Sequence, residues 1–312
     1  MRVITQLSTG GPEVLEVGEA PVPEPLPTEI RVRVAAAGVN PVDWKTRSGA
    51  GMARVLGPPP FTVGWDVAGV VDAVGPGVTR FDVGDEVFGM PWFPRQAGAY
   101  AEYVTAPSRH FALRPSGLSA VEAGALPLAG LTAWQCLVDI ADVRPGQRVL
   151  VHAAAGGVGH LAVQIAKARG AHVVGTASAG KHELLASLGV DEAVDYRTQA
   201  FEEVVEPVDV VYDLIGGEVA LRSLDVLRSD GVMICLPSAA AADAMAAAAE
   251  RGLHATGMLV EPDGDGLADL AALVDEGRLR VLVAETFPLE RAADAHRRGE
   301  QGRTTGKLVL TP

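Results

Sequence analysis

The sequence predicts an α/β protein of two domains, one rich in β-strands and one built around a doubly wound parallel sheet. From Gln147 onward, short apolar runs alternate with helical patterns, which is typical of parallel strands joined by right-handed crossovers. Residues 1–115 instead show short strands separated by turns. A chain of 312 residues also exceeds one average domain, which favours this division.

The residue pattern in the first part of the chain is typical of a compact β-rich domain. Ile30–Val34 alternates apolar and charged residues, Val67–Val74 is a longer apolar run, and Gly75–Gly77 marks a turn. Ser119 and Glu122 then have the spacing of a helix capping box, so a helical region is expected to begin there.

The rest of the chain alternates strands and helices. We expect strands over 147–153, 171–176, 192–195, 208–214 and 231–236, an alanine-rich helix over 239–250, and later strands over 281–287 and 307–310 around a helix over 289–298.

The segment Val149–Gly159 is an apolar strand that breaks into glycines and then into a helical pattern. Gly156 and Gly157 permit a tight turn and close approach to a pyrophosphate, while Gly159 lets the helix pack on its strand. Free N–H groups at the helix start suit an anion. Ala154 stands where the usual fingerprint has its first glycine, so an ordinary glycine-rich turn is the alternative. The predicted phosphate-binding residues are Ala155, Gly156, Gly157, Val158 and Gly159.

The next strand indicates which dinucleotide is bound. An NAD site places Asp or Glu about 20 residues beyond the glycines. Here Ala177 and Ser178 occupy that corner, Lys181 follows one helical turn later, and Tyr196 follows the third strand. Hydroxyl groups and a cation suit a 2′-phosphate, so these residues predict NADP(H). The alternative is that Lys181 is a solvated residue at a helix start.

Composition excludes several other classes of function. The formal net charge of −13 argues against nucleic acid and anionic membranes as partners. Cys136 and Cys235, the only cysteines, lie in apolar stretches, which disfavours a disulfide framework or a cysteine metal cluster. No apolar run approaches the length of a membrane span, and Met1–Thr5 does not open a signal peptide. A cytoplasmic protein is therefore expected.

Eight segments in order along the chain resemble the medium-chain dehydrogenase/reductase superfamily, and within it the zinc-independent quinone oxidoreductases. These segments are Gly38–Lys45, Gly64–Val71, Gly77–Phe81, Gly84–Gly89, Gly98–Val104, Leu131–Trp134, Ala155–Gly159 and Gly306–Leu310.

The resemblance implies a chaperonin-10-like catalytic domain over residues 1–118 and a Rossmann NADP-binding domain over residues 119–260. Residues 261–312 would complete the Rossmann sheet region and return to the catalytic domain. A homodimer formed through the Rossmann sheets, with the segment 253–260 as one candidate contact, is also implied.

Departures from the zinc-bearing branch of this family indicate a reaction without a metal. Those relatives carry a cysteine where this chain has Asn40 and a His-Glu pair where it has Trp65 and Asp66. They also carry a lobe with four closely spaced cysteines, for which residues 89–98 offer no counterpart. A catalytic zinc needs about three convergent N, S or O ligands. We therefore expect no metal.

Without a metal, the expected chemistry is hydride transfer from NADPH to a quinone or an enone, whose conjugation delocalises the arriving charge. The protein then contributes positioning and hydrogen-bond donors for the developing oxyanion. Asn40 lies at the family's substrate-facing position and is the predicted donor, with ordinary Asn-Pro turn chemistry as the alternative. Asp43 and Lys45 are predicted to order this loop or to relay a proton.

The remaining cofactor candidates follow from family position and topology. Thr132 lies in the segment that the family places beside the nicotinamide, or it bonds its own helix backbone. Ile215 and Leu236 should lie at the carboxyl ends of the sheet, where cofactors bind. Lys307 approaches the cofactor edge, or it is a solvated lysine that opens a strand.

Three functions remain open at this point. Quinone reduction by NADPH is the leading hypothesis, and reduction of enones, including polyketide-like enones, is the second. A protein that binds NADPH without catalysis is the hypothesis from another class.

Overall fold

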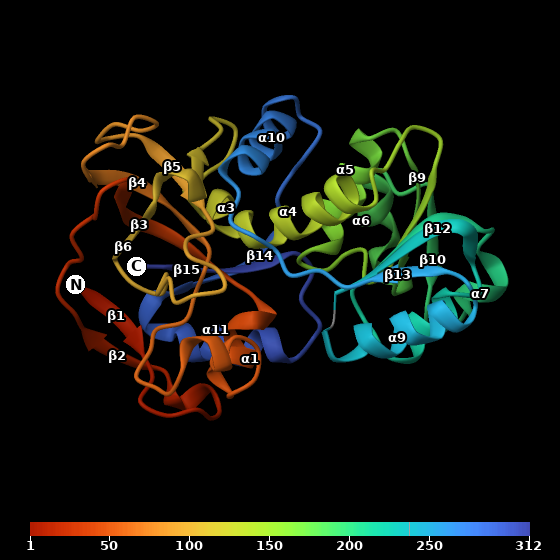
Figure 1. Ribbon diagram of the computed structural model, residues 1–312, viewed down its shortest axis with the longest axis horizontal. Coiled ribbons are helices and arrows are strands. Elements are labelled where there is room, and N and C mark those ends of the chain that lie inside the picture. Colours follow the sequence, from red (N-terminus) through yellow and green to blue (C-terminus); the bar gives the residue numbers. More distant parts are fainter. Residues whose placement is uncertain (237) are drawn as a thin grey trace. The chain divides into compact units, whose positions relative to one another are not determined.

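The computed structural model describes residues 1–236 and 238–312, without the side chains of 238–240, and packs the chain into two units (Figure 1). The first unit combines residues 1–131 with residues 261–312, and the second spans residues 132–260. The first boundary lies later than the predicted 118/119, because the helix that Ser119 begins packs on strands of the first unit.

The first unit is organised around the long strand β3 (Glu29–Val39). Its mixed sheet has the order β14-β15-β3-β4-β5-β7, and β6 pairs with β3 outside this path. The other strands of the unit are β1 (Arg2–Thr5), β2 (Glu16–Glu19), β4 (Val67–Val74), β5 (Glu86–Gly89), β6 (Tyr103–Pro107), β7 (Phe111–Leu113), β14 (Val283–Pro288) and β15 (Lys307–Thr311).

Helices and short turns connect these strands. The helices are α1 (Pro41–Arg47), α2 (Ala53–Leu56), α3 (Ala120–Ala125), α10 (Gly264–Asp275) and α11 (Ala292–Glu300), with 3-10 turns η1 (Pro12–Val14), η2 (Ser108–His110) and η5 (Leu289–Arg291). The expected capping box begins α3, since Ser119 Oγ accepts from the Glu122 N–H and Glu122 Oε2 accepts from the Ser119 N–H. The helix expected over 289–298 is η5 followed by α11.

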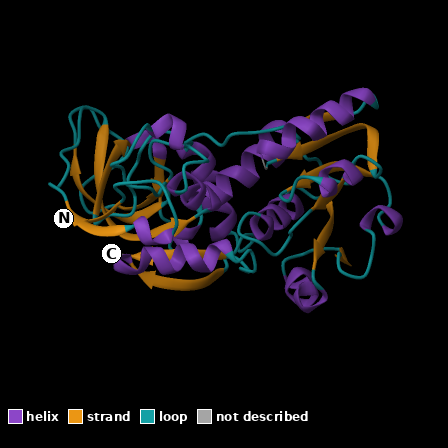
Figure 2. Cartoon of the chain, turned by 90° about the horizontal axis from the view of Figure 1, so that it is seen from below, coloured by secondary structure: helices purple, strands orange, loops and turns teal. Residues whose placement is uncertain are grey.

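The second unit is a parallel sheet in the order β10-β9-β8-β11-β12-β13. This reversal of strand order on either side of β8 is the doubly wound topology that the alternating pattern predicts. Figures 1 and 2 show helices on either side of these strands. The strands are β8 (Arg148–Val151), β9 (His172–Ala177), β10 (Glu192–Asp195), β11 (Val208–Asp213), β12 (Leu227–Cys235) and β13 (His254–Thr256).

The helices of the second unit fill the crossovers between its strands. They are α5 (Gly159–Ala168), α6 (His182–Ser187), α7 (Phe201–Val204), α8 (Glu218–Ser223) and α9 (Ser238–Glu250), with the 3-10 turn η4 (Ala179–Lys181). α4 (Pro127–Trp134) crosses the boundary between the units and runs into the π-helical turn η3 (Gln135–Ile140).

We expected residues 261–312 to complete the parallel sheet region and to return to the catalytic domain, and only the return is seen in the described strands. The described strands of this segment, β14 and β15, belong instead to the mixed sheet of the first unit. β15 pairs antiparallel with β3, with Leu308 opposite Val39. One residue further along this register, Lys307 comes opposite Asn40, so the return strand brings the far end of the chain to the first candidate site residue.

Candidate functional site

The glycine-rich segment of the second unit forms a tight turn between β8 and α5. Ala153 adopts the left-handed conformation, with φ of 49°, and the Gly156 N–H donates to the Ala153 carbonyl at 2.8 Å. A Cβ atom on Gly159 would lie 2.3 Å from the Ala153 oxygen, so only glycine permits this close approach of helix and strand.

Three backbone N–H groups at this turn are free to bind an anion. Among the residues that the structure describes, none accepts a hydrogen bond from the N–H of Gly157, Val158 or Gly159. These groups lie at the N-terminus of α5, where unpaired donors and the helix dipole favour negative charge. The turn therefore has the donors and the close backbone approach that a dinucleotide phosphate requires.

The carboxyl end of β9 carries the residues predicted to select the cofactor. The Tyr196 N–H donates to the Ala177 carbonyl at 3.4 Å, which brings the ends of β9 and β10 together. The Tyr196 ring is 58% exposed, and Arg197 lies 5.9 Å from its centroid. Ser178 and Lys181 are half-buried, and Lys181 forms no ion pair with any described residue. A cation without a carboxylate partner beside this corner suits a phosphate group.

Thr132 lies near the end of α4, just before the helix widens into the π-helical turn. Its backbone carbonyl accepts a hydrogen bond from the Tyr212 hydroxyl at 3.2 Å. Both residues are buried, and burial raises the pKa of the Tyr212 hydroxyl well above its ordinary value, with a smaller contribution from Cys136. Tyr212 thus anchors the backbone of Thr132 to β11.

A buried carboxylate that the sequence did not single out organises the ends of β11 and β12. Asp213 accepts from the N–H groups of Ile215 at 2.9 Å and Gly216 at 2.9 Å, which is an Asx-type turn. The Cys235 thiol also donates to it at 3.2 Å, and the Leu236 N–H donates to its carbonyl at 3.0 Å. Ile215, half-exposed, and Leu236 therefore lie at the carboxyl edge of the sheet, as their topology predicted.

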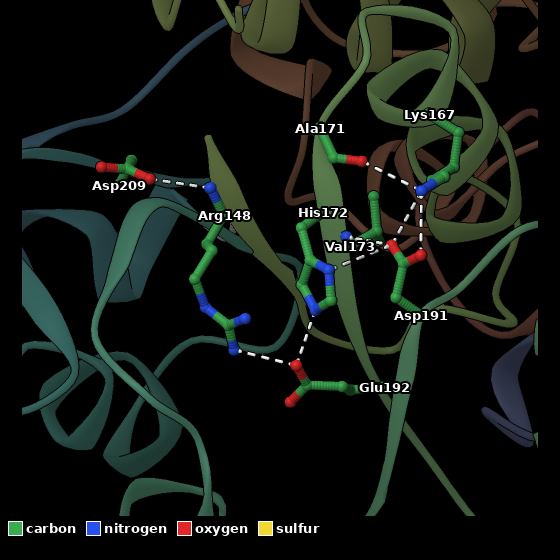
Figure 3. Close-up of polar contacts among 8 residues, drawn as sticks. All are labelled: Arg148, Lys167, Ala171, His172, Val173, Asp191, Glu192 and Asp209. Atoms are coloured by element: carbon green, nitrogen blue, oxygen red, sulfur yellow. Dashed lines mark hydrogen bonds and ion pairs between the residues drawn. The ribbon is translucent and has the colours of Figure 1, made fainter. Parts of the chain in front are cut away.

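The amino edge of the same sheet carries a separate polar network (Figure 3). His172 Nε2 lies 2.6 Å from Glu192 Oε1, and Arg148 Nη2 lies 3.1 Å from the same oxygen. Burial acts to raise the pKa of Asp191, but the hydrogen bonds from Lys167 and the Val173 N–H outweigh it and leave that pKa below its ordinary value. These contacts tie the amino ends of neighbouring strands together and lie away from the carboxyl edge.

In the first unit, Lys307 is buried rather than solvated. It is 3% exposed, and its ammonium donates to the Val39 carbonyl at 3.2 Å and to Asn40 Oδ1. Its Nζ also lies 3.5 Å from Asp66 Oδ2. The alternative that Lys307 is a solvated residue is therefore wrong, because the register of β15 on β3 places it inside the unit.

Asp66 lies directly before β4 and is completely buried. Its Oδ2 accepts from Asn40 Nδ2 at 2.8 Å, and its Oδ1 accepts from the Leu128 N–H at 2.6 Å, near the start of α4. Burial raises the pKa of Asp66, while Lys307 and these two hydrogen bonds act in the opposite direction. A Cβ atom on Gly38 would lie 2.5 Å from Asp66 Oδ2, so glycine on β3 makes room for this carboxylate.

Asn40 stands at the beginning of α1 rather than in a free turn. Its backbone N–H donates to Asp43 Oδ2 at 2.7 Å, and Pro41 occupies the first helical position. Its side chain is 2% exposed and is held between Asp66 and Lys307. The structure thus brings Asn40, Asp43, Asp66 and Lys307 into one buried cluster, which we call the Asn40 cluster.

Asp43 connects the Asn40 cluster to a buried chain of donors. The Tyr100 hydroxyl donates to Asp43 Oδ2 at 3.1 Å and lies 3.1 Å from His296 Nε2. Arg47 Nη1 lies 3.2 Å from His296 Nδ1. Arginine is only a donor, so His296 accepts at Nδ1 and donates from Nε2 to the Tyr100 oxygen. The permanently charged Arg47 ends this chain, which holds Asp43 in place.

Burial shifts the pKa values of the two ionisable groups in this hydrogen-bonded chain, Asp43 and His296, in opposite directions. It raises the pKa of Asp43 to about 7, with the charge of Asp66 acting in the same direction and the Asn40 N–H opposing it. It lowers the pKa of His296 to about 3, with the charge of Arg47 adding to the effect. Asp43 Oδ1 is buried without a hydrogen-bond partner among the described residues.

Lys45 does not join the other candidates in this unit. It lies on α1 two residues after Asp43, and its side chain is exposed while Asp43 is completely buried. Residues two apart on a helix do not share a face. Lys45 and Asp43 were predicted to act together, but the structure separates them.

Sequence reasoning missed Tyr100 and His296 as members of this network. Tyr100 lay in the motif Gly98–Val104 without an assigned role, and nothing marked His296 in the sequence. In the described part of the chain, no group of three His, Cys, Asp or Glu side chains comes together to hold a metal ion. No described helix has the length and apolar character needed to cross a membrane.

Two family models match the chain. The model of the alcohol dehydrogenase GroES-like domain matches residues 26–116, and that of the zinc-binding dehydrogenase matches residues 188–310. Zinc does not fit the positions at which zinc-bearing relatives carry ligands. Trp65 offers only an indole N–H, which donates to the Arg95 carbonyl at 2.6 Å, and the Lys307 ammonium already lies between Asn40 and Asp66.

Two curated relatives are similar over nearly the whole chain. A 2-haloacrylate reductase from a Burkholderia species is 37% identical and covers 97% of this chain and 96% of its own length. A pikromycin polyketide synthase component from Streptomyces venezuelae is 38% identical over 94% of this chain, which spans only 8% of that protein.

Two solved structures are also similar to the whole of this chain. The quinone oxidoreductase from Coxiella burnetii superposes with a TM-score of 0.93 at 36% identity, covering 100% of this chain and 99% of that chain. The Escherichia coli quinone oxidoreductase complexed with NADPH has a TM-score of 0.87 at 31% identity, with both chains covered completely (100%). The chain therefore belongs to the medium-chain dehydrogenase/reductase superfamily, in its quinone-oxidoreductase-like branch.

Proposed function

We propose that this protein is an NADPH-dependent reductase that transfers hydride to a quinone without a metal. The observation that carries the proposal is the carboxyl edge of the parallel sheet. At a strand end that has no carboxylate for a ribose 2′-OH, Lys181 and the N–H groups of Gly157, Val158 and Gly159 have no partner among the described residues. The related structure from Escherichia coli was solved with NADPH, which supports the same cofactor here.

The residues of the second unit would hold the cofactor through two kinds of contact. The backbone of residues 155–159 would bind the pyrophosphate, and Ser178, Lys181 and Tyr196 would surround the 2′-phosphate, with Ala177 leaving room for it. Thr132, Ile215 and Leu236 would contact the nicotinamide half, the last two through the backbone at the sheet edge. Bound NADPH supplies the hydride.

The Asn40 cluster would act on the acceptor. Hydride addition to a quinone, followed by one proton, gives a hydroquinone and NADP⁺, so negative charge develops on an oxygen. Asn40 would donate its remaining amide N–H to that oxygen. Asp43 lies one hydrogen bond from the Asn40 backbone and would order this loop. Lys45, exposed on the other side of α1, has no contact that supports a catalytic role.

A conjugated enone is the second candidate acceptor. The 37% identical relative is named a 2-haloacrylate reductase, and the 38% identical one is a polyketide synthase component. An acrylate carries a C=C bond conjugated to a carbonyl group, which accepts hydride at carbon by the same electronic logic as a quinone.

We also propose a homodimer located in the cytoplasm. β13 pairs only with β12 among the described strands, so it is an edge of the parallel sheet with an unpaired side available to a second copy. Cys136 and Cys235 are both buried free thiols, which suits a reducing compartment.

The proposed cofactor and acceptor are tested together by following NADPH and NADH oxidation with para-quinones, ortho-quinones and enones. NADPH oxidation with quinones is the expected result. Preferential turnover of enones would select the second acceptor, and saturable NADPH binding without any turnover would indicate a binding protein.

Lys181→Ala is the matched variant for cofactor choice. Loss of a charge-assisted contact to phosphate typically costs about 1.5–3 kcal/mol, so NADPH affinity should fall roughly tenfold to a hundredfold. NADH lacks the 2′-phosphate and is the internal control, with its affinity nearly unchanged. Equal losses for both cofactors would contradict the assignment of Lys181.

A further inference from the structure

A buried lysine, Lys307, lies beside the candidate donor Asn40. Lysine is almost never fully buried unless it is paired, and Lys307 is 3% exposed. Its ammonium donates to the Val39 carbonyl and to Asn40 Oδ1, and it forms an ion pair with Asp66 Oδ2 at 3.5 Å. The buried charge is therefore fully engaged, and one of its partners is the Asn40 amide.

The partners of Asn40 determine which way its side-chain amide points. An ammonium only donates and a carboxylate only accepts, so the amide oxygen must face Lys307 and the amide nitrogen must face Asp66. One hydrogen of Nδ2 is used by Asp66. The second hydrogen meets no acceptor among the residues that the structure describes.

The charge on Lys307 also changes the amide electronically. A cation at the carbonyl oxygen draws electron density from the amide nitrogen, and hydrogen-bonded groups polarise one another in this way in a low-dielectric interior. The N–H that remains becomes a stronger donor. A side chain of this kind, held in one orientation before substrate arrives, is what stabilisation of a developing oxyanion requires.

We propose that Lys307 is a positioning residue of the reductase, an internal cation that orients and polarises Asn40 for the substrate oxyanion. The proposal rests on the proposed function for the role of Asn40. It assigns to a lysine of the C-terminal strand the place between Asn40 and Asp66. The positive charge beside Asn40 is then supplied by a side chain of the protein itself.

The activity test compares Lys307→Met with Asn40→Ala and with the two substitutions combined. We expect Lys307→Met to lower kcat at least tenfold without changing NADPH affinity. The combined variant should be no slower than Asn40→Ala, because Lys307 acts through Asn40. Losses that multiply in the combined variant, or an unchanged kcat in Lys307→Met, would overturn the proposal.

A second variant separates this role from folding. Lys307→Met leaves Asp66 as an uncompensated buried charge, which destabilises proteins. Adding Asp66→Asn replaces the pair by neutral groups and should restore the melting temperature while kcat stays low. Recovery of kcat together with stability would show that Lys307 is only structural.

An activity-independent readout is available because Asn40 is the only asparagine in the chain. Protein labelled with ¹⁵N-asparagine should show a single side-chain NH₂ pair in its NMR spectrum. We expect its ¹⁵N resonance to move upfield in Lys307→Met, because the nitrogen regains electron density. An unchanged resonance would overturn the proposal even if the wild-type protein reduced no quinone or enone, a result that would count against the proposed function alone.

Discussion

At the scale of single residues, the first unit buries ionisable side chains. Asp43 and His296 are both enclosed and are linked through the Tyr100 hydroxyl. The motif that contains Asn40 and Asp43 could be read from the sequence. The burial of Lys307 could not, because it depends on the register of a strand from the opposite end of the chain.

The pKa of Asp43 predicts a pH dependence of stability. Its folded pKa of about 7 lies above the ordinary 3.8, so the folded protein binds more protons than the unfolded chain between these values. The stabilisation that Asp43 contributes to the folded protein is therefore complete below pH 4 and is lost as the pH rises through 7. In urea unfolding, the free energy of unfolding of the wild type should fall by up to about 1.4 kcal/mol per pH unit in this window, relative to that of Asp43→Asn.

The control for this measurement is Glu203→Gln, which removes an exposed carboxylate from α7. Its stability curve should run parallel to that of the wild type. Parallel curves for wild type and Asp43→Asn would show that Asp43 keeps an ordinary pKa in the folded protein.

At the scale of elements, periodicity predicted five of the six described strands of the parallel sheet within a few residues and missed β13. β10 has the expected bounds, whereas β12 begins earlier, at Leu227. The π-helical turn after α4 could not be predicted, because it depends on long-range contacts such as the Tyr212 bond to Thr132. The glycine turn was predictable, since the close approach at Gly159 allows only one residue type.

The edge strand β13 predicts the oligomeric state. Its backbone is paired on one side only among the described strands, so a second copy can extend the sheet across a two-fold axis. Light scattering over a range of concentrations should give twice the mass of one chain. A monomeric mass at micromolar concentration would remove this proposal.

At the scale of the whole molecule, the chain builds a β-rich unit, then a nucleotide-binding unit, and then returns to the first. Composition and alternation of elements could predict two domains, whereas the return of residues 261–312 to the first unit was implied only by the family resemblance. The return has a chemical result, because β15 delivers Lys307 to Asn40.

The most direct test of this account is a primary kinetic isotope effect, measured on metal-stripped protein with NADPH deuterated at either face of nicotinamide C4. We expect quinone-dependent oxidation that survives chelation and slows with deuterium on one face only. Turnover that disappears on chelation and returns with zinc, or NADPH binding without any oxidation, would contradict metal-free hydride transfer.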